Sequence, residues 1–138
     1  MRFDIRSDLL PTLAFAATIA SNTTTSGAII DTADYDLGSQ LVALLSAFTD
    51  GIYEIQVWES DQSNMSGATQ ITNTDQLIGS IANLTALTAQ GANPDSLGFI
   101  GNKRYIQVRV VSTGVTTGAR VIVLLNMKGE VLPDNLLN

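Results

Sequence analysis

Apolar and polar side chains alternate along several short segments of this chain, and turn-forming residues separate the segments. The clearest segment covers residues 52–59, where alternation places Tyr53, Ile55 and Val57 on one face of a strand. The polar residues between them then lie on the opposite face. This period of two predicts strands with one buried face, and it constrains the fold more than any other feature of the sequence.

The second alternating segment has Ile106, Val108 and Val110 on its inward face. A turn rich in Gly and Thr follows at residues 113–118, and residues 119–127 return as an apolar strand. This arrangement predicts a β-hairpin. Because the returning strand is apolar on both faces, we expect its own core to bury one face and another surface to bury the other.

An earlier hairpin is predicted in the first half of the chain. Residues 40–48 are apolar enough to pair with the strand at 52–59, and Asp50-Gly51 between them is a tight-turn signal. Residues 41–47 taken alone also fit a short helix, and their pattern leaves that alternative open.

Four weaker strand candidates lie at residues 13–19, 28–31, 76–81 and 97–100. Loops rich in turn residues separate them, at residues 21–27, 61–67 and 89–95. Short strands at this spacing, without a convincing amphipathic helix, predict an all-β protein. We expect an antiparallel β-sandwich with jelly-roll-like connections. The pattern does not determine the strand order.

The domain organisation predicted is one β-sandwich domain, residues 12–127, with an N-terminal arm at 1–11 and a C-terminal arm at 128–138. Both arms are more apolar than solvated tails usually are. We therefore expect the arms to dock on a neighbouring molecule or on the domain itself. Their apolar residues are Phe3, Ile5, Leu9 and Leu10 in the first arm and Val131, Leu132, Leu136 and Leu137 in the second.

Histidine and cysteine are both absent from the sequence. The histidine imidazole is the most frequent general base near neutral pH and the most frequent ligand of transition metals. Cysteine forms disulfides and many zinc sites. The sequence therefore predicts no enzyme, no cofactor and no metal site of these kinds. Charged residues make up only 14% of the chain, against about 25% in soluble domains. This deficit favours a surface that partners cover in part.

Charge is unevenly distributed along the chain, whose formal net charge is −6. No Lys or Arg lies between Ser7 and Asn102, a span that contains ten acidic residues. Such a chain repels phosphate backbones, so we expect no nucleic acid among its partners. No uninterrupted apolar run is long enough for a membrane-spanning helix, so no membrane partner is expected.

The acidic residues suggest two alternative kinds of site, a cation site and a catalytic pair of carboxylates. Asp31, Asp34 and Asp36 lie close enough in sequence to hold a hard cation, although calcium takes about six or more oxygen ligands and a solvated acidic loop is the simpler interpretation. Asp50, Glu54 and Glu59 supply pairs of carboxylates of the kind that glycosidases use. Because nothing in the sequence sets the separation within such a pair, outer-face acids on a strand are the favoured interpretation.

Two aromatic residues, Tyr53 and Trp58, suggest a sugar-stacking platform. Alternation places them on opposite faces of the strand, however, so they do not form one platform together. We expect Tyr53 in the core and Trp58 at an edge or an interface.

Two segments resemble the head decoration, or cement, proteins of tailed bacteriophages. One is Ser96-Leu-Gly-Phe-Ile-Gly-Asn-Lys-Arg-Tyr-Ile-Gln-Val-Arg-Val, followed by a Thr/Gly turn and an apolar strand. The other is Thr49-Asp-Gly-Ile-Tyr-Glu-Ile-Gln-Val-Trp-Glu-Ser-Asp. The resemblance implies a virion component on the capsid exterior, assembled in the host cytoplasm, that clamps neighbouring major capsid subunits as a dimer or trimer. The residues after Leu132 depart from the pattern of that group, which leaves the oligomer geometry open.

The function expected is therefore capsid stabilisation through subunit contacts, with the major capsid protein and further copies of this chain as partners. A homotrimer is favoured over a homodimer. A receptor- or glycan-binding module on a virion surface is the alternative. The interface residues predicted are Phe3, Ile5, Arg6, Leu9, Leu10, Trp58, Arg109, Val121, Val123, Leu125, Val131, Leu132, Leu136 and Leu137.

Overall fold

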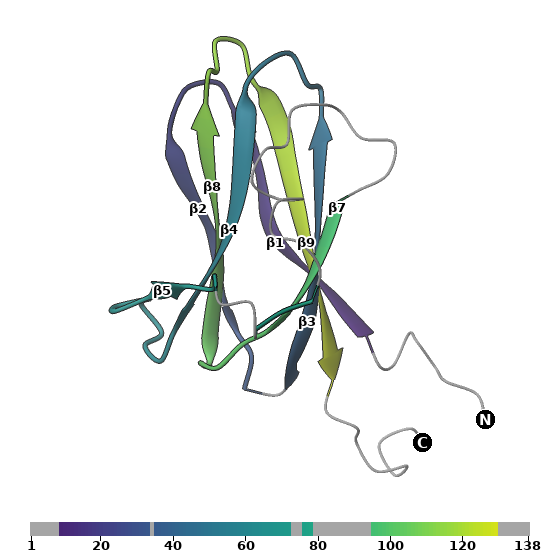
Figure 1. Cartoon of the computed structure of the whole chain (residues 1–138), viewed down its shortest axis with the longest axis vertical. Coiled ribbons are helices and arrows are strands. Elements are labelled where there is room, and N and C mark those ends of the chain that lie inside the picture. Colours follow the sequence, from purple (N-terminus) through teal and green to yellow (C-terminus); the bar gives the residue numbers. More distant parts are fainter. Residues whose placement is uncertain (1–8, 34, 73–75, 79–94, 130–138) are drawn as a thin grey trace, which may run out of the picture.

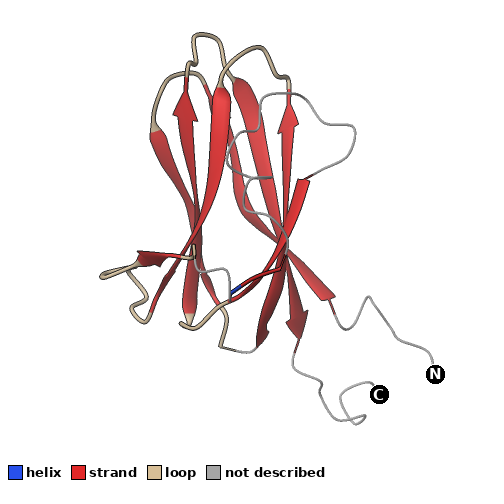
Figure 2. Cartoon of the chain, in the orientation of Figure 1, coloured by secondary structure: helices blue, strands red, loops and turns tan. Residues whose placement is uncertain are grey.

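The computed structural model describes residues 9–33, 35–72, 76–78 and 95–129. Strands make up most of this part of the chain, as Figure 2 shows. They form two antiparallel sheets that pack face to face (Figure 1). The all-β antiparallel sandwich predicted from the alternation is confirmed. No helix among the described residues is long and apolar enough to cross a membrane.

Sheet A has the strand order β1-β9-β3-β7-β6, and sheet B has the order β2-β8-β4-β5. Every strand pair among the described residues is antiparallel. The strands of sheet A are β1 (Leu9–Ile19), β3 (Tyr35–Ser46), β6 (Leu77–Ile78), β7 (Asp95–Ile100) and β9 (Ala119–Gly129). The strands of sheet B are β2 (Thr24–Asp31), β4 (Ile52–Ser60), β5 (Thr69–Gln70) and β8 (Tyr105–Thr113).

Both predicted hairpins are wrong. β3 lies in sheet A and β4 in sheet B, while β8 lies in sheet B and β9 in sheet A. The turns at 47–51 and 114–118 reverse the chain, but they carry it across the core to the facing sheet. The alternating pattern is compatible with both arrangements. A returning strand can pair beside the preceding strand in the same sheet or lie opposite it in the facing sheet, and in both cases its apolar side faces the same core.

Glycine is needed at the second of these crossings. Gly118 has φ +106°, and a Cβ built there would lie 1.9 Å from the carbonyl oxygen of Ile19. A larger residue would meet both backbone strain and a steric clash with the end of β1. The Gly-rich composition of the turn therefore serves a tight passage between sheets rather than a hairpin.

Inward-facing side chains were predicted correctly. Tyr53 and Val57 on β4 are buried, as are Ile106, Val108 and Val110 on β8. Apolar side chains of sheet A meet them across the interior, so the two sheets share one core. The sheet A residues in that core are Ala14, Phe15, Ile19, Leu41, Ala43, Leu45, Ala119, Val121, Val123, Leu125 and Met127.

The strand boundaries differ from the prediction in several places. β1 begins at Leu9, inside the predicted N-terminal arm, and β9 continues to Gly129, past the predicted domain boundary. Leu9 pairs with Lys128, so the chain enters and leaves sheet A at one end. β2 begins at Thr24, within the predicted loop at 21–27, because Ser and Thr are tolerated on the exposed side of an edge strand.

β1 and β2 are edge strands of their sheets and approach each other at one corner of the sandwich. A Cβ built on Gly27 would lie 2.2 Å from the carbonyl oxygen of Ala14, so only glycine allows this approach. Both strands have a register shift near this point. Such bulges bend an edge and reduce its tendency to pair with other chains.

Candidate interaction surfaces

The outer surface of sheet A carries six apolar side chains in two adjacent rows. Strand pairing sets Leu13 beside Leu124 and Leu124 beside Val42. The next row along the strands holds Ala16, Ile122 and Leu44. We call this set the aliphatic face. Its residues are Leu13, Ala16, Val42, Leu44, Ile122 and Leu124.

The aliphatic face is most open to solvent where β1 and β9 lie side by side. Leu13 is 55% exposed and Leu124 is 39% exposed. The rows of residues on either side are polar or contain proline, with Arg120 in one row and the pair Asn126 and Gln40 in the other. Asn126 Nδ2 donates a hydrogen bond to Gln40 Oε1 over 3.3 Å. An apolar centre with a polar rim is the anatomy of a protein–protein interface.

Three predicted interface residues lie in the core and not on an outer surface. Val121, Val123 and Leu125 are 0% exposed and lie in the core of their own sandwich. Assigning them to a subunit interface was therefore wrong. The strand is apolar on both faces, as noted from the sequence, but the outward face belongs to Ile122 and Leu124.

Trp58 and Arg109, two further predicted interface residues, meet on the outer surface of sheet B. The guanidinium carbon of Arg109 lies 4.3 Å from the centroid of the Trp58 ring. Arg109 Nε donates to Gln107 Oε1 at 3.0 Å, and Trp58 Nε1 donates to Gln56 Oε1 at 2.9 Å. Gln56 Nε2 in turn donates to Glu54 Oε1 at 2.9 Å. We call these five residues the Trp58–Arg109 network.

The network orients its members through shared hydrogen bonds and a cation–π contact. Gln107 is anchored by a hydrogen bond of 3.0 Å from its Nε2 to the carbonyl oxygen of Gly27 on β2. Each of these contacts restricts the two groups that it joins. Residues of β2, β4 and β8 therefore together fix the orientation of the guanidinium plane. The sequence analysis assigned Trp58 and Arg109 to an interface, but could not show that they stack.

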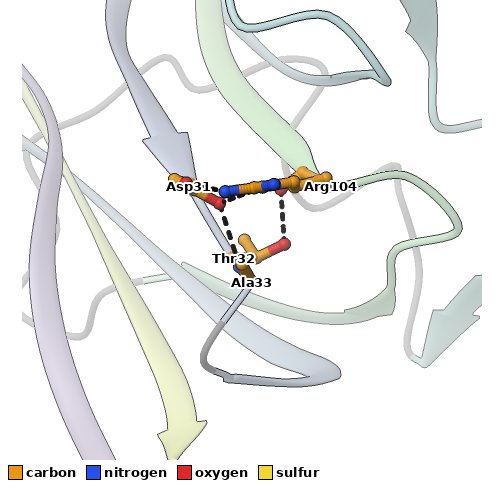
Figure 3. A network of polar contacts seen from close by, with 4 residues as sticks. All are labelled: Asp31, Thr32, Ala33 and Arg104. Atoms are coloured by element: carbon orange, nitrogen blue, oxygen red, sulfur yellow. Dashed lines mark hydrogen bonds and ion pairs between the residues drawn. The ribbon is translucent and has the colours of Figure 1, made fainter.

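A second polar cluster lies where β2 ends (Figure 3). Arg104 donates to both carboxylate oxygens of Asp31 at 2.8 Å, and Ala33 N–H donates to Asp31 Oδ1 at 3.0 Å. Thr32 Oγ1 donates to the carbonyl oxygen of Arg104 at 2.5 Å. The hydrogen bonds from Arg104 and then from Ala33 lower the pKa of Asp31 from 3.8 to about 2.

The ion pair between Asp31 and Arg104 involves one of the three acids that the sequence suggested as ligands of a cation. Asp31 is engaged by a guanidinium, Asp34 lies outside the described residues, and nothing is described of the Asp36 side chain. No group of three possible ligands occurs within the described ranges. The cation site therefore gains no support from the geometry.

The carboxylates weighed as a glycosidase pair have separate roles. Asp50 accepts backbone hydrogen bonds from Thr116, Thr117 and Gly118, and its carboxylate also accepts the Thr116 hydroxyl. The hydroxyl contact first, and the Gly118 N–H next, lower the pKa of Asp50. Asp50 thus fastens the β3–β4 turn to the β8–β9 turn.

Glu59 fastens the opposite end of β4. Its side chain is buried, and Oε2 accepts the Asn102 N–H at 2.8 Å and the Lys103 N–H at 3.3 Å. Glu54 lies on the outer face of the same strand, so the two acids point to opposite sides of the sheet. The structure does not bring them together as a catalytic pair.

The remaining predicted interface residues are described only in part. β1 includes the backbone of Leu9 and Leu10, but nothing is described of their side chains. The others lie outside the described residues. They are Phe3, Ile5, Arg6, Val131, Leu132, Leu136 and Leu137.

Sequence reasoning missed the aliphatic face as a set. A signal for it was present, because Ile122 and Leu124 alternate with the core residues of the same strand. Leu13, Val42 and Leu44 gave no comparable signal, since their position beside those residues depends on strand order.

Comparison with known proteins found no matching family model. No match was found among curated proteins or solved structures either. The functional interpretation therefore follows from the two outer surfaces of the sandwich and from the sequence pattern.

Proposed function

We propose that this chain is a virion structural protein that decorates and stabilises a phage capsid exterior. Its aliphatic face would dock on the major capsid protein at the junction of neighbouring subunits. The aliphatic face is the observation that carries this proposal, because Leu13 and Leu124 lie side by side and both are exposed, and contiguous apolar patches on a protein surface mark interaction sites. We propose a homotrimer, in preference to a homodimer, as its oligomeric state.

The proposed mechanism is mechanical. Completely burying an aliphatic side chain that was fully exposed contributes about 1.5–3 kcal/mol. The side chains of the aliphatic face are partly buried already, so each would contribute about 1 kcal/mol on docking. Part of this is offset by the lost freedom of the bound protein. A small gain repeated over every symmetry-related site would strengthen the whole shell.

We also propose jelly-roll connectivity, a finer description than the sandwich itself. Two features support it. Most connections cross between the sheets, and four strands of each sheet interleave in the orders β1-β9-β3-β7 and β2-β8-β4-β5. Eight strands in two such sheets are typical of a double Greek key. Jelly rolls are common among viral shell proteins, which is consistent with the proposed role.

The alternative function, a glycan- or receptor-binding module, has less support. Its main motivation was Trp58 as a stacking platform, and one side of that ring is engaged by Arg109. A glycan array probed with the purified protein tests it. Strong, selective binding that Trp58→Ala abolishes would favour this alternative over capsid stabilisation.

Electron microscopy of the native particle tests the leading proposal. Density for this sandwich at symmetry-related positions outside the major capsid protein is expected. Leu124→Asp should lower the occupancy of those positions by more than about tenfold, because a buried unpaired carboxylate is costly. Ile52→Asp is the matched control, since Ile52 is 44% exposed but lies on sheet B. Absence of the protein from the capsid lattice would contradict the proposal.

A further inference from the structure

We propose that Arg109 is a binding site for a carboxylate presented by an acidic peptide segment of a partner protein. The site lies on the outer surface of sheet B, on the other side of the sandwich from the aliphatic face. It is therefore independent of the proposed capsid contact, and both surfaces can be occupied at once. Four observations carry the inference.

The first observation is that the guanidinium of Arg109 is held in place. Trp58 stacks against it at 4.3 Å, and its Nε donates to Gln107 at 3.0 Å. Gln107 is itself held by the carbonyl oxygen of Gly27, and Trp58 is held by Gln56. A side chain fixed before binding loses little conformational freedom when a ligand arrives, which favours affinity.

The second observation is that the donor capacity of Arg109 is largely unused. Only Nε makes a hydrogen bond, and the two terminal nitrogens have no acceptor within the part of the chain that the structure describes. Across the sheet, strand register places Gln56 and Ser26 opposite Arg109, and neither is an acid. Arg104 differs, since it forms a bidentate ion pair with Asp31.

The third observation concerns the charge of the ligand. A planar guanidinium with its terminal N–H groups free matches a carboxylate or a phosphate through paired hydrogen bonds. Glu54 and Asp31 lie on the same surface, and the chain carries a net charge of −6. A singly charged carboxylate meets less repulsion there than a phosphate dianion does.

The fourth observation is that apolar side chains lie near the arginine. Ile29 is 42% exposed and pairs with Gln107, one of the residues that hold Arg109. Val111 follows two residues after Arg109 on β8, so both point to the same side of the sheet. A peptide carrying an acid between apolar residues would engage all three, whereas a free anion or a sugar acid would engage only the arginine.

The single tryptophan of the chain makes the test direct, because Trp58 stacks on the proposed site. The probe is the peptide acetyl-Ala-Leu-Glu-Leu-Ala-amide, and the matched control peptide has Gln in place of Glu. Binding is followed through Trp58 emission and the NMR shift of its indole N–H. We expect saturable binding of the Glu peptide near about 1 mM and binding of the Gln peptide at least about tenfold weaker.

Variants assign the binding to Arg109. Arg109→Gln should remove the difference between the two peptides. Arg109→Lys keeps the charge without the planar fork and should bind the Glu peptide several-fold more weakly. If circular dichroism shows that Arg109→Gln does not fold, Arg109→Lys alone tests the role of Arg109.

Three results would overturn the proposal. One is an equal response to both peptides in the unmodified protein. Another is a preference for the Glu peptide that survives in Arg109→Gln or is undiminished in Arg109→Lys. The third is a stronger response to sialyllactose or inorganic phosphate than to the Glu peptide, which would assign the arginine to a different ligand.

Discussion

The two outer surfaces of the sandwich differ although the two inner surfaces are alike. Both sheets turn apolar residues to a common core. Outside, sheet A presents the aliphatic face, with side chains that have no polar groups, and sheet B presents the Trp58–Arg109 network, in which hydrogen bonds link neighbouring side chains. The shared core accounts for the composition of the inner surfaces, and we expect contacts with partners on the outer ones.

The difference also separates two ways of recognising a partner. An aliphatic surface gains free energy from area and gives little directional preference. An oriented arginine gains free energy from one well-aligned pair of hydrogen bonds. We infer that sheet A supplies adhesion to a large surface and sheet B supplies selectivity for a particular group.

The largest expected effect is a difference in stability between variants of two neighbouring residues of β9. Leu125→Ala should lower the free energy of unfolding by about 2–5 kcal/mol, because Leu125 is fully buried in the core. Leu124→Ala, one residue away on the aliphatic face, should change it by about 0.5 kcal/mol or less. Urea denaturation of the two variants measures both values. Equal losses would show that the outer surface of sheet A is part of the folding core.

The second prediction concerns the corner where the two sheets approach. Gly27→Ala should lower the free energy of unfolding by about 1–3 kcal/mol, since the added methyl would overlap the carbonyl oxygen of Ala14. Ser26→Ala is the control, because Ser26 is exposed on the same strand. Thermal unfolding followed by circular dichroism compares them. A Gly27→Ala protein as stable as the control would mean that the two edges are not in contact.

Several features were predictable from residue pattern alone. Alternation identified β4 and β8 and the side chains that point inward, because burial on one face imposes a period of two. Pairing partners were not predictable. A turn such as Asp50-Gly51 reports only a reversal of the chain, and it takes contacts between distant residues to show that β3 and β4 face each other across the core.

The candidate surfaces were predictable to a different extent. Trp58 and Arg109 were assigned to an interface, and both lie on an outer surface, since each alternates with core residues on its own strand. Their contact with each other requires β4 to pair with β8, and no local feature of the sequence predicts that pairing. Val121 shows the opposite failure, because a strand that is apolar on both faces gives no local indication of which face is inward.

A third prediction tests the network on sheet B. Arg109→Ala should lower the free energy of unfolding by about 0.5–1 kcal/mol, which is the usual size of a half-exposed cation–π contact. It should also change the emission of Trp58, the only tryptophan. Val42→Ala on the aliphatic face is the comparison, and its emission should match that of the unmodified protein. Unchanged emission in Arg109→Ala would show that the two side chains do not stack in solution.

The smallest expected effect is a dependence of stability on pH. Arg104 lowers the pKa of Asp31 to about 2, below its ordinary value of 3.8. The stabilisation is therefore complete above about pH 5 and is lost as the pH falls from about 4 to 2. Because the pair is exposed, the change should be small.

Asp31→Asn isolates this contribution. The difference in urea midpoint between the unmodified protein and Asp31→Asn should shrink as the pH is lowered through that range. Asp50, whose pKa is also lowered, is present in both proteins and cancels to first order. A difference that stays constant down to about pH 2 would mean that the ion pair does not form.

The most direct test of the proposed docking through sheet A uses cysteine labelling, because the chain contains no cysteine of its own. Leu124→Cys and Ile52→Cys place one thiol on each outer surface. Both thiols should react readily with a maleimide in the isolated protein. In native particles we expect Cys at position 124 to be protected and Cys at position 52 to react as before. Equal labelling of the two positions in the particle would contradict docking through sheet A.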